Sequence, residues 1–342
     1  MPPKIKPSRI YIDITNQCQL RCLHCYASSG AKRDGELTLA EIKNLIDQVC
    51  EMRVKNVSFS GGEPLMRAEL PEILEYARKK DLNTALLTNG LLINEEWAKL
   101  FAKLNIRVKM SLDGATAKTH DYLRGKGSFE KLKKAISHLR QAKVDDIALH
   151  FTIHRKNVKE ILLLPELLHQ LGVRNLVVGT IKPSGRAAIN SELLLPPAMM
   201  PYIQQKVSLL SLSEYVNIQQ FSEKGWDGFG CPATCNKLGI TATGNATVCV
   251  FLGPDFIGNS IRDYSLAELW EQHLAQEDFF VANDKCAKCP IVSDTGGGCR
   301  ARALYYHQDV NATDPHCCAL YEQSLFLEKY NLGLRRELQL ID

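Results

Sequence analysis

The chain has 342 residues, of which 45% are hydrophobic and 23% are charged, and its formal net charge is +4. This composition excludes a globally disordered chain, and the weakly basic balance without a dense basic stripe argues against a nucleic-acid binder. No apolar run is long enough to span a bilayer, and the N-terminal residues lack the apolar core of a signal peptide. We therefore expect a cytoplasmic protein without a membrane partner.

Six short β-branched segments alternate with amphipathic helices in the first half of the chain. The expected strands are residues 9–15, 56–60, 83–87, 107–112, 147–153 and 175–180, and the expected helices are residues 37–52, 67–80, 94–104, 129–141 and 158–171. Such alternation produces a parallel sheet with right-handed crossovers. Six strands are too few for the eight-stranded closed barrel, so the sequence predicts an α/β fold, either a partial (β/α)6 barrel or a doubly wound sheet.

The pattern changes after residue 183, which we expect to end the first domain. Residues 184–230 hold one convincing helix, about 197–210, and read as a linking region. Residues 231–342 are rich in glycine, cysteine and short strands and end in an amphipathic helix at about 319–330. We therefore predict a core at 1–183, a bridging region at 184–230 and a cysteine-rich C-terminal domain at 231–342.

Twelve cysteines are the unusual feature of the composition. A secreted disulfide scaffold would be shorter and would carry a signal peptide, so clustered cysteines in a chain of this kind indicate metal ligation. Apart from Cys50, they form an N-terminal and a C-terminal group. The first contains Cys18, Cys22 and Cys25, and the second contains Cys231, Cys235, Cys249, Cys286, Cys289, Cys299, Cys317 and Cys318.

The N-terminal group has the spacing Cys-x3-Cys-x2-Cys and follows the first strand directly. Three thiolates this close can hold one face of a [4Fe–4S] cluster and leave one iron without a protein ligand, whereas ordinary electron-transfer clusters have four protein ligands. An open iron can chelate a small molecule. A zinc ion with a distant fourth ligand is the alternative.

This loop and the turns after later strands resemble the radical SAM superfamily. The motifs follow strands two, three and four in order: Gly61-Gly62-Glu63-Pro64, Thr88-Asn89-Gly90 and Ser111-Leu112-Asp113-Gly114. The resemblance implies that Glu63 and nearby carbonyls meet the ammonium of S-adenosylmethionine (SAM), that Ser111 meets its ribose, and that Arg124 holds its carboxylate. His24 and Tyr26 flank the third cysteine, where the family places an adenine contact.

The resemblance covers about residues 9–182 and implies a reaction. SAM chelates the open iron, an electron from the cluster cleaves its sulfonium bond, and the 5′-deoxyadenosyl radical abstracts a hydrogen atom from the substrate. A flavodoxin or ferredoxin is the implied reductant. The alternative outside the enzymes is a non-catalytic iron–sulfur carrier or sensor. The intact Gly61-Gly62-Glu63-Pro64 motif argues against this alternative.

The C-terminal cysteines resemble the SPASM extension of radical SAM enzymes, which holds auxiliary iron–sulfur clusters. The resemblance assigns Cys231, Cys235, Cys249 and Cys299 to a first cluster and Cys286, Cys289 and Cys317 to a second. Thr295 stands where the family pattern has another cysteine. Asp294, His316 or Cys318 could replace it, or the second cluster could be open or absent; we expect a non-cysteine or open site. A zinc ribbon is the alternative for this region.

The substrate is less clearly indicated. Val250 follows Cys249, where sulfatase-maturing members have an aspartate. Only eight residues precede the first strand, so we expect any leader-binding module to be a separate protein. We predict modification of a ribosomally made peptide, by crosslinking or epimerisation. The alternative is decarboxylation or epimerisation of a small molecule or tetrapyrrole, as in the haem-pathway branch.

No residue is identified as catalytic by pattern alone. Cys318 and Cys50 are weak candidates for a hydrogen-atom donor, although Cys50 has the spacing of a core residue. His150 and His154 lie on or beside the fifth strand and are more often structural. Arg186 could bind an acidic substrate or SAM, or could belong to a helix-entry turn.

Overall fold

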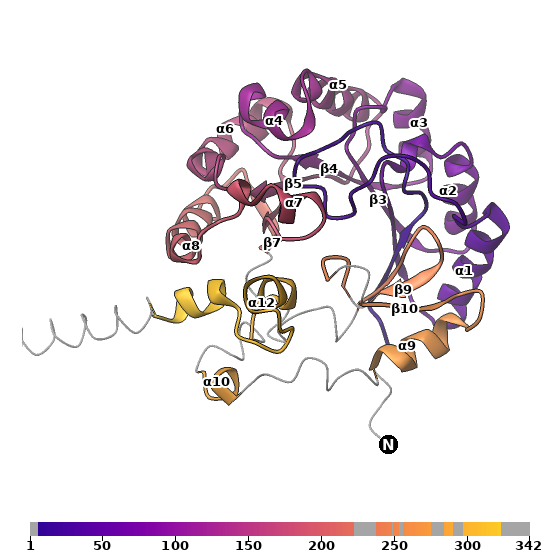
Figure 1. The fold of residues 1–342 in the computed structure, drawn as a ribbon. Helices are drawn as coiled ribbons and strands as arrows, with labels where there is room; N and C mark the ends of the chain where they lie inside the picture. The colour runs from indigo at the N-terminus through magenta and orange to yellow at the C-terminus, as the bar shows by residue number, and fades with distance from the viewer. Residues whose placement is uncertain are drawn as a thin grey trace, which may run out of the picture.

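The computed structural model describes residues 6–221, 237–247, 249–252, 256–274, 284–289 and 297–322. One ten-stranded sheet runs through it in the order β10-β9-β8-β1-β2-β3-β4-β5-β6-β7. Figure 1 shows the sheet curved, with α1 to α6 arranged around its outside. In the described part of the chain, no helix is long and apolar enough to cross a membrane.

The six expected strands form the middle of the sheet, and every neighbouring pair among them is parallel. They are β1 (Arg9–Asp13), β2 (Asn56–Ser60), β3 (Asn83–Thr88), β4 (Arg107–Leu112), β5 (Ile147–Ile153) and β6 (Asn175–Thr180). The strands do not close into a ring in this sheet order. The fold is a partial barrel of the expected α/β class.

Most of the helices follow the expected positions with shifted ends, whereas α4 and α7 were not expected. The helices in this part of the chain are α1 (Leu39–Glu51), α2 (Leu70–Lys79), α3 (Glu95–Lys103), α4 (Ala117–Arg124), α5 (Ser128–Gln141), α6 (Leu164–Leu171), α7 (Arg186–Ile189) and α8 (Met200–Leu210). Thr38 and Glu41 make the capping box at the start of α1. The expected helix at 158–171 is divided into a 3-10 turn, η2 (Val158–Leu163), and α6, which has proline in its first turn.

Two further parallel strands flank the six. The strand β7 (Asn217–Phe221), in the expected linking region, pairs with β6, and β8 (Lys237–Ile240) pairs with β1. The antiparallel strands β9 (Asn245–Thr247) and β10 (Ile257–Ser260) continue from β8. The C-terminal cysteine-rich region thus begins as an extension of the core sheet, a pairing that the sequence did not predict.

The rest of the described C-terminal region consists of helices joined by turns. It contains α9 (Leu266–Leu274), α10 (Asp284–Ala287) and α12 (Arg300–His307), followed by helical residues 315–322. The remainder of the expected final helix lies outside the described residues. Figure 1 shows α10 and α12 on the side of the curved sheet away from α2 to α5.

The two faces of the sheet differ in chemistry. Ile10, Ile12, Phe59, Val108 and Phe151 point toward the helices and belong to one buried apolar cluster. Strand residues alternate between faces, so the residues between them point inward. The register places Tyr11 beside Ser58 and Asp13 beside Ser60, and it places Ser111 beside His150. The inward face therefore carries polar groups from β1, β2, β4 and β5.

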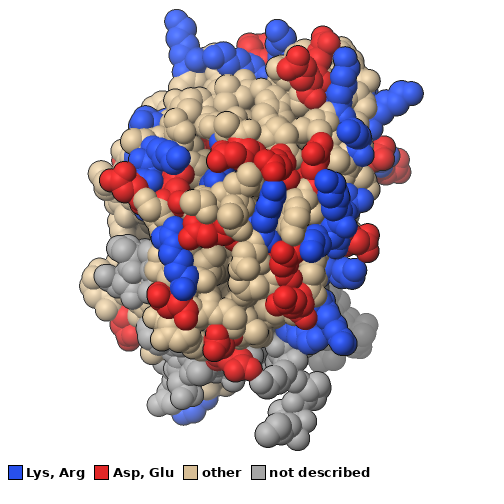
Figure 2. Space-filling view, turned by 90° about the vertical axis from the view of Figure 1, so that its right-hand side faces the viewer, with Lys and Arg blue, Asp and Glu red and all other residues tan. Residues whose placement is uncertain are grey.

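The outer surface carries both signs of charge. Figure 2 shows Lys and Arg interspersed with Asp and Glu over one face. Ion pairs connect neighbouring helices, with Lys43 Nζ 2.5 Å from Glu72 Oε1 and Lys80 Nζ 2.6 Å from Asp47 Oδ1. Exposed pairs of this kind contribute little to stability, at most about 1 kcal/mol each.

Candidate active site

The first cysteine group lies on a loop that leaves β1 and closes on itself. The backbone N–H of Cys18 donates to Gly30 O at 2.9 Å, and the N–H of Gly30 donates to Asn16 O at 3.1 Å. Glu36 holds the start of the loop, because its carboxylate accepts the Thr15 hydroxyl at 2.9 Å and the Asn16 N–H at 2.7 Å. The loop is thereby fixed before its first thiol.

The glycine turn after β2 packs against this loop at backbone distance. A Cβ on Gly61 would lie 2.2 Å from Thr15 O, and one on Gly62 would lie 2.4 Å from Gln17 O. Gly61 also has a φ of +138°, which favours glycine. The N–H of Gly62 donates to Thr15 O and that of Glu63 to Gln17 O, both at 2.8 Å. Only glycine allows this approach.

Glu63 joins the ends of β2 and β3. Its carboxylate accepts the Thr88 hydroxyl at 2.6 Å, the Asn89 N–H at 2.8 Å and the Leu65 N–H at 3.2 Å. The side chain is fully buried, and this burial raises its pKa, against the effect of the hydrogen bonds. Glu63, which was expected to contact the SAM ammonium group, therefore holds the ends of two strands together. Its carboxylate oxygens have further lone pairs that can accept a hydrogen bond from another donor.

The three thiols of the loop lie near one another and near these strand ends. Burial, with Glu63, Cys22 and Cys25 nearby, raises the pKa of Cys18 to about 11. Asn89 Nδ2 lies 3.9 Å from Cys18 Sγ, and the Asn89 amide exchanges hydrogen bonds with the Gln19 amide at 3.2 and 3.3 Å. Asn89 is therefore placed beside the first cysteine, a contact that the sequence did not predict.

Asp113, at the end of β4, anchors the opposite side of the loop. Its carboxylate pairs with Arg124 Nε from α4 and with His24 Nε2 at 3.2 Å. Arg124 Nη1 lies 3.9 Å from Cys22 Sγ. Although burial opposes ionisation, the nearby Arg124 and His24 hold the pKa of Asp113 well below its usual range. The aspartate thus fixes two of the groups that were expected to contact SAM, Arg124 and His24.

The backbone of Asp113 is also engaged. Its carbonyl accepts Asn157 Nδ2 at 3.0 Å and lies 3.2 Å from His154 Nε2, while its N–H donates to His120 Nδ1 at 3.2 Å. His154 Nδ1 accepts the Lys156 N–H at 3.2 Å, so both ring nitrogens of His154 have backbone partners. This buried histidine is in a structural position, although it was a candidate for catalysis.

A short segment after β6 clamps the cysteine loop from the other side. Arg186 Nε donates to Cys22 O at 2.7 Å, and its Nη1 donates to Ser29 O at 3.0 Å. Asn190 Nδ2 donates to Leu23 O at 2.9 Å. A Cβ on Gly185 would lie 2.2 Å from Tyr26 O. Arg186 was a candidate for binding the substrate or SAM, but its guanidinium group donates to the backbone of the loop instead.

Several polar side chains on the inward face have no hydrogen bond or ion pair with other described residues: Asp13, Lys109, Ser111 and His150. Burial raises the pKa of Asp13 to about 7 and lowers that of Lys109 to about 8. The His150 ring has accessible surface, yet surrounding protein lowers its pKa to about 4. The strand register places these four side chains on the same face of the sheet.

The C-terminal region reaches the first cysteine loop through an aromatic contact. The rings of Tyr26 and Phe251 meet edge to face, with centroids 5.2 Å apart. Nearby Asp13 and burial raise the pKa of Tyr26 well above its usual range, and Cys249 adds to this effect. Tyr26 was expected near a bound cofactor, and the structure places it between the loop and the segment that carries Cys249.

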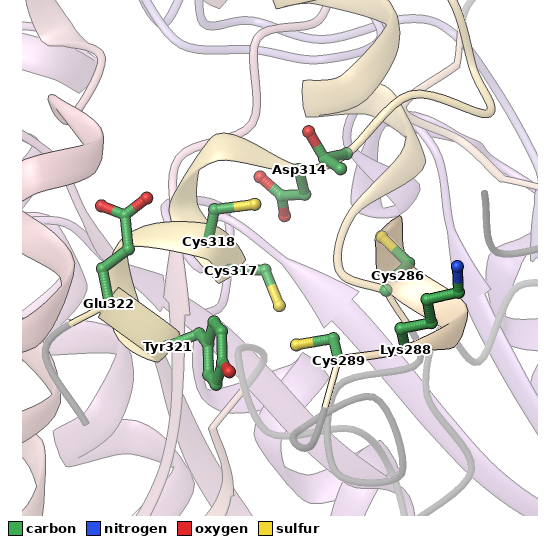
Figure 3. Close-up of a pocket in the computed structure, with 10 residues that line it drawn as sticks. Cys286, Lys288, Cys289, Asp314, Cys317, Cys318, Tyr321 and Glu322 are labelled. Carbon is green, nitrogen blue, oxygen red and sulfur yellow. The ribbon is translucent and has the colours of Figure 1, made fainter. Parts of the chain in front are cut away.

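The later cysteines gather at a second place. Cys286, Cys289, Cys317 and Cys318 line a cavity of about 170 Å³ (Figure 3). Beside it, Arg302 holds Asp314 with Nε at 2.9 and 3.0 Å and Nη2 at 2.6 Å. Asp314 Oδ2 also accepts the N–H of Cys299 at 2.7 Å.

The remaining candidates are placed as follows. Cys50 lies on α1, packed beside the core, with its Sγ 3.9 Å from Lys80 O. Cys231, Cys235, Asp294 and Thr295 lie outside the described residues. Among the described residues, no three His, Cys, Asp or Glu side chains surround a point closely enough for a single metal ion. A cubane cluster offers each thiolate a separate iron, so its ligands need not meet at one point.

The donor set fits an iron–sulfur cluster and a polar ligand on the N-terminal loop. Thiolates ligate such clusters, and a bound metal deprotonates thiols even where burial disfavours the charge. Within the described structure, two buried polar atoms beside Cys22 and Cys25 lack a partner, namely Asp113 Oδ1 and His24 Nδ1. Buried polar atoms of this kind usually indicate a missing ligand or water.

Comparison with known proteins agrees with this geometry. Residues 12–168 match the profile of the radical SAM superfamily, and residues 231–290 match the SPASM iron–sulfur cluster-binding domain. The AdoMet-dependent heme synthase of Methanosarcina barkeri is 31% identical over 340 residues, covering 91% of this chain and 96% of the relative. The chain belongs to the radical SAM superfamily. As a radical SAM enzyme, it uses a [4Fe–4S] cluster and SAM, and its SPASM domain is of the type that binds auxiliary clusters.

Other radical SAM enzymes resemble the chain over most of its length. The mycofactocin maturase MftC of Mycolicibacterium smegmatis is 29% identical over 322 residues, covering 89% of this chain and 81% of the relative. The crystal structure of Streptococcus suis SuiB bound to the precursor peptide SuiA has a TM-score of 0.74 at 17% identity and covers 90% of this chain and 75% of SuiB. At that identity, SuiB supports the shared fold.

Sequence reasoning missed several residues that shape this radical SAM site. The Glu36 and Asn190 contacts with the loop depend on tertiary placement and have no local pattern. The contact between Phe251 and Tyr26 joins segments more than 200 residues apart, so spacing gives no sign of it. Lys109 did offer a signal, because it is a charged residue in the middle of a central strand, β4.

Proposed function

We propose that this radical SAM enzyme modifies a ribosomally made peptide, by forming a crosslink or by epimerising a residue. When bound, SAM and its cluster supply the radical that removes a hydrogen atom from the substrate. The enzyme's own residues position the substrate and exclude water. The named relative MftC is a maturase, which supports this choice of substrate class.

The polar inward face carries the proposal. Asp13, Lys109, Ser111 and His150 offer acidic, basic, hydroxyl and imidazole groups that lack partners among the described residues. Peptide amides and side chains can satisfy such groups by hydrogen bonding. A tetrapyrrole is large and planar, and its pocket would be lined mainly by apolar and aromatic residues.

We also propose roles for the individual site residues. Cys18, Cys22 and Cys25 would hold the SAM cluster, and the Gly61–Pro64 turn with Asn89 would border the methionine end of SAM. Ser111 would face the ribose, and Arg124, fixed by Asp113, the carboxylate. His24 and Tyr26 would lie beside the cluster. The auxiliary clusters would use Cys231, Cys235, Cys249 and Cys299, and Cys286, Cys289 and Cys317.

The proposal extends to partners and setting. A flavodoxin or ferredoxin would supply single electrons, and a separate protein would present the precursor peptide. Iron–sulfur ligation by many reduced cysteines favours a cytoplasmic location. We also propose a core at 1–183, a bridging region at 184–230 and an auxiliary-cluster domain at 231–342, with β7 and β8 joining all three in one sheet.

The test is an anaerobic reaction with SAM, reduced flavodoxin and short peptides encoded beside the gene. We expect 5′-deoxyadenosine and a peptide that has lost two hydrogens, or has gained deuterium from heavy water without another change. Cys22→Ala should abolish both products, and Cys50→Ala is the matched control. Formation of 5′-deoxyadenosine without a changed peptide would refute the peptide proposal, and no cleavage of SAM would refute an enzymatic role.

A second candidate is oxidative decarboxylation of a tetrapyrrole. The identity with the Methanosarcina barkeri heme synthase favours it. The same reaction with iron-coproporphyrin III in place of the peptide distinguishes the two, because this substrate would lose carbon dioxide. We place this candidate second because peptide amides and side chains can pair with each of the four inward-facing groups, whereas a macrocycle can do so only through its carboxylates.

A further inference from the structure

The four cysteines that line the C-terminal cavity come from two separate segments of the chain. Cys286 belongs to α10 and Cys289 follows it, with the Cys289 N–H donating to Cys286 O at 3.0 Å. Cys317 and Cys318 are neighbours in the helical residues 315–322. All four line the same cavity of about 170 Å³. Four thiols around one space are a complete set for a [4Fe–4S] cluster.

This set differs from the pattern of the SPASM resemblance. That pattern supplies Cys286, Cys289 and Cys317, and its fourth ligand would come from the position occupied by Thr295. A threonine side chain has no thiol. The cluster therefore either has an open iron or takes its fourth ligand from elsewhere in this chain.

Two nearby groups that could replace the cysteine are engaged elsewhere. Asp314 accepts three hydrogen bonds from Arg302 and others from the backbone N–H groups of Cys299 and His316. His316 Nε2 lies 3.0 Å from Leu195 O, and the ring is buried. Asp314 already lines the cavity, so to bind iron it would have to give up hydrogen bonds from the buried Arg302 guanidinium. Turning His316 toward the cavity would leave the Leu195 carbonyl without its partner. Both changes are costly.

Cys318 is placed for the role. Figure 3 shows its Sγ and that of Cys286 directed toward the space from opposite sides, while the Sγ atoms of Cys317 and Cys289 lie lower in the view and are directed toward each other. Successive residues of a helix point about 100° apart. Two adjacent cysteines cannot share one metal atom comfortably, but they can reach two different corners of a cube. Adjacency therefore does not exclude Cys318.

We propose that Cys318 is the fourth ligand of the second auxiliary cluster. The cluster is then closed by four thiolates: Cys286, Cys289, Cys317 and Cys318. This replaces the expectation of a non-cysteine or open site. A closed cluster has no vacant iron to which the substrate could bind.

The experiment measures cyanide binding to the reconstituted full-length protein. Cys18→Ala/Cys22→Ala/Cys25→Ala is the parent, so that the cluster proposed to bind SAM does not contribute. Iron content and the electron paramagnetic resonance of the reduced protein are recorded with ¹³C-cyanide. We expect no ¹³C coupling in the parent. Adding Cys318→Ala should create ¹³C coupling in the resonance of the second auxiliary cluster, or should lower the iron content because the corner iron without a ligand is lost. Adding Cys50→Ala should change neither the coupling nor the iron content.

Further variants keep the proposal testable if Cys318→Ala loses the whole cluster. Cys318→Ser supplies an oxygen ligand and should keep the iron while shifting the resonance of one cluster. An unshifted resonance in Cys318→Ser would overturn the proposal. So would ¹³C coupling in the parent, which means an open iron. The proposal also fails if Asp294→Ala, rather than Cys318→Ala, creates the coupling.

Discussion

Replacing Gly62 by alanine tests whether backbone contact between the glycine turn and the cysteine loop builds the SAM site. The new Cβ would lie 2.4 Å from Gln17 O and 2.6 Å from Asn16 O, and both atoms are backbone. The turn must therefore move away, breaking the bonds from Gly62 N to Thr15 O and from Glu63 N to Gln17 O. Two such bonds contribute about 2 kcal/mol, and overpacking costs about 1–3 kcal/mol more.

The measurement is anaerobic SAM binding, together with the rate of 5′-deoxyadenosine formation. If only the two lost hydrogen bonds affect binding, the dissociation constant for SAM rises about thirtyfold. The control is Gly258→Ala, whose Cβ would meet Ala246 O at an ordinary 3.5 Å. Unchanged SAM affinity in Gly62→Ala, with normal iron content, would refute the reasoning.

Three other predictions concern charged groups. Asp113→Asn leaves Arg124 buried beside Cys22 without its counter-charge and should destabilise the apoprotein by about 3–5 kcal/mol in chemical denaturation. The control is Asp81→Asn, which breaks an exposed ion pair and should cost at most about 1 kcal/mol. Arg302→Lys removes the fork that holds Asp314 and should lower the iron bound by the C-terminal cysteines; iron analysis that matches the wild type would contradict this. Burial raises the pKa of Asp13 from 3.8 to about 7, so the folded state holds this proton more firmly. The bound proton therefore stabilises the folded state below pH 4, and this stabilisation is lost as the pH rises through 7. Asp13→Asn removes the titrating group, so it should reduce the drop in apoprotein melting temperature between pH 5 and pH 8. An equal drop in the wild type and the variant would count against a raised pKa.

Much of the fold can be predicted from local pattern. The bounds of β2, β4, β5 and β6 agree with the sequence, because short β-branched runs between polar turns define both ends of a buried strand. The capping box of α1 is confirmed for a similar reason, since Thr38 and Glu41 act within one turn. Helix α4 was missed because its eight residues are mostly polar.

The pairing of distant segments could not be predicted in the same way. The strand β8 has only four residues, and nothing in Lys237–Ile240 specifies β1 as its partner. The motifs around Glu63 and Asp113 were found from sequence, but their hydrogen-bond partners were not. Those partners depend on which strand ends meet at one edge of the sheet, and this is decided by the whole fold.

The parallel pairing of β1 with β8 also has a consequence for synthesis on the ribosome. The strand that leads into the first cysteine loop has one edge uncovered until residues 237–240 have been made. At roughly 5–20 residues per second, this interval lasts on the order of 10–45 seconds. During that time β1 is an open edge available to other nascent chains. Efficient production of this enzyme therefore depends on protecting the growing chain until its late strand arrives.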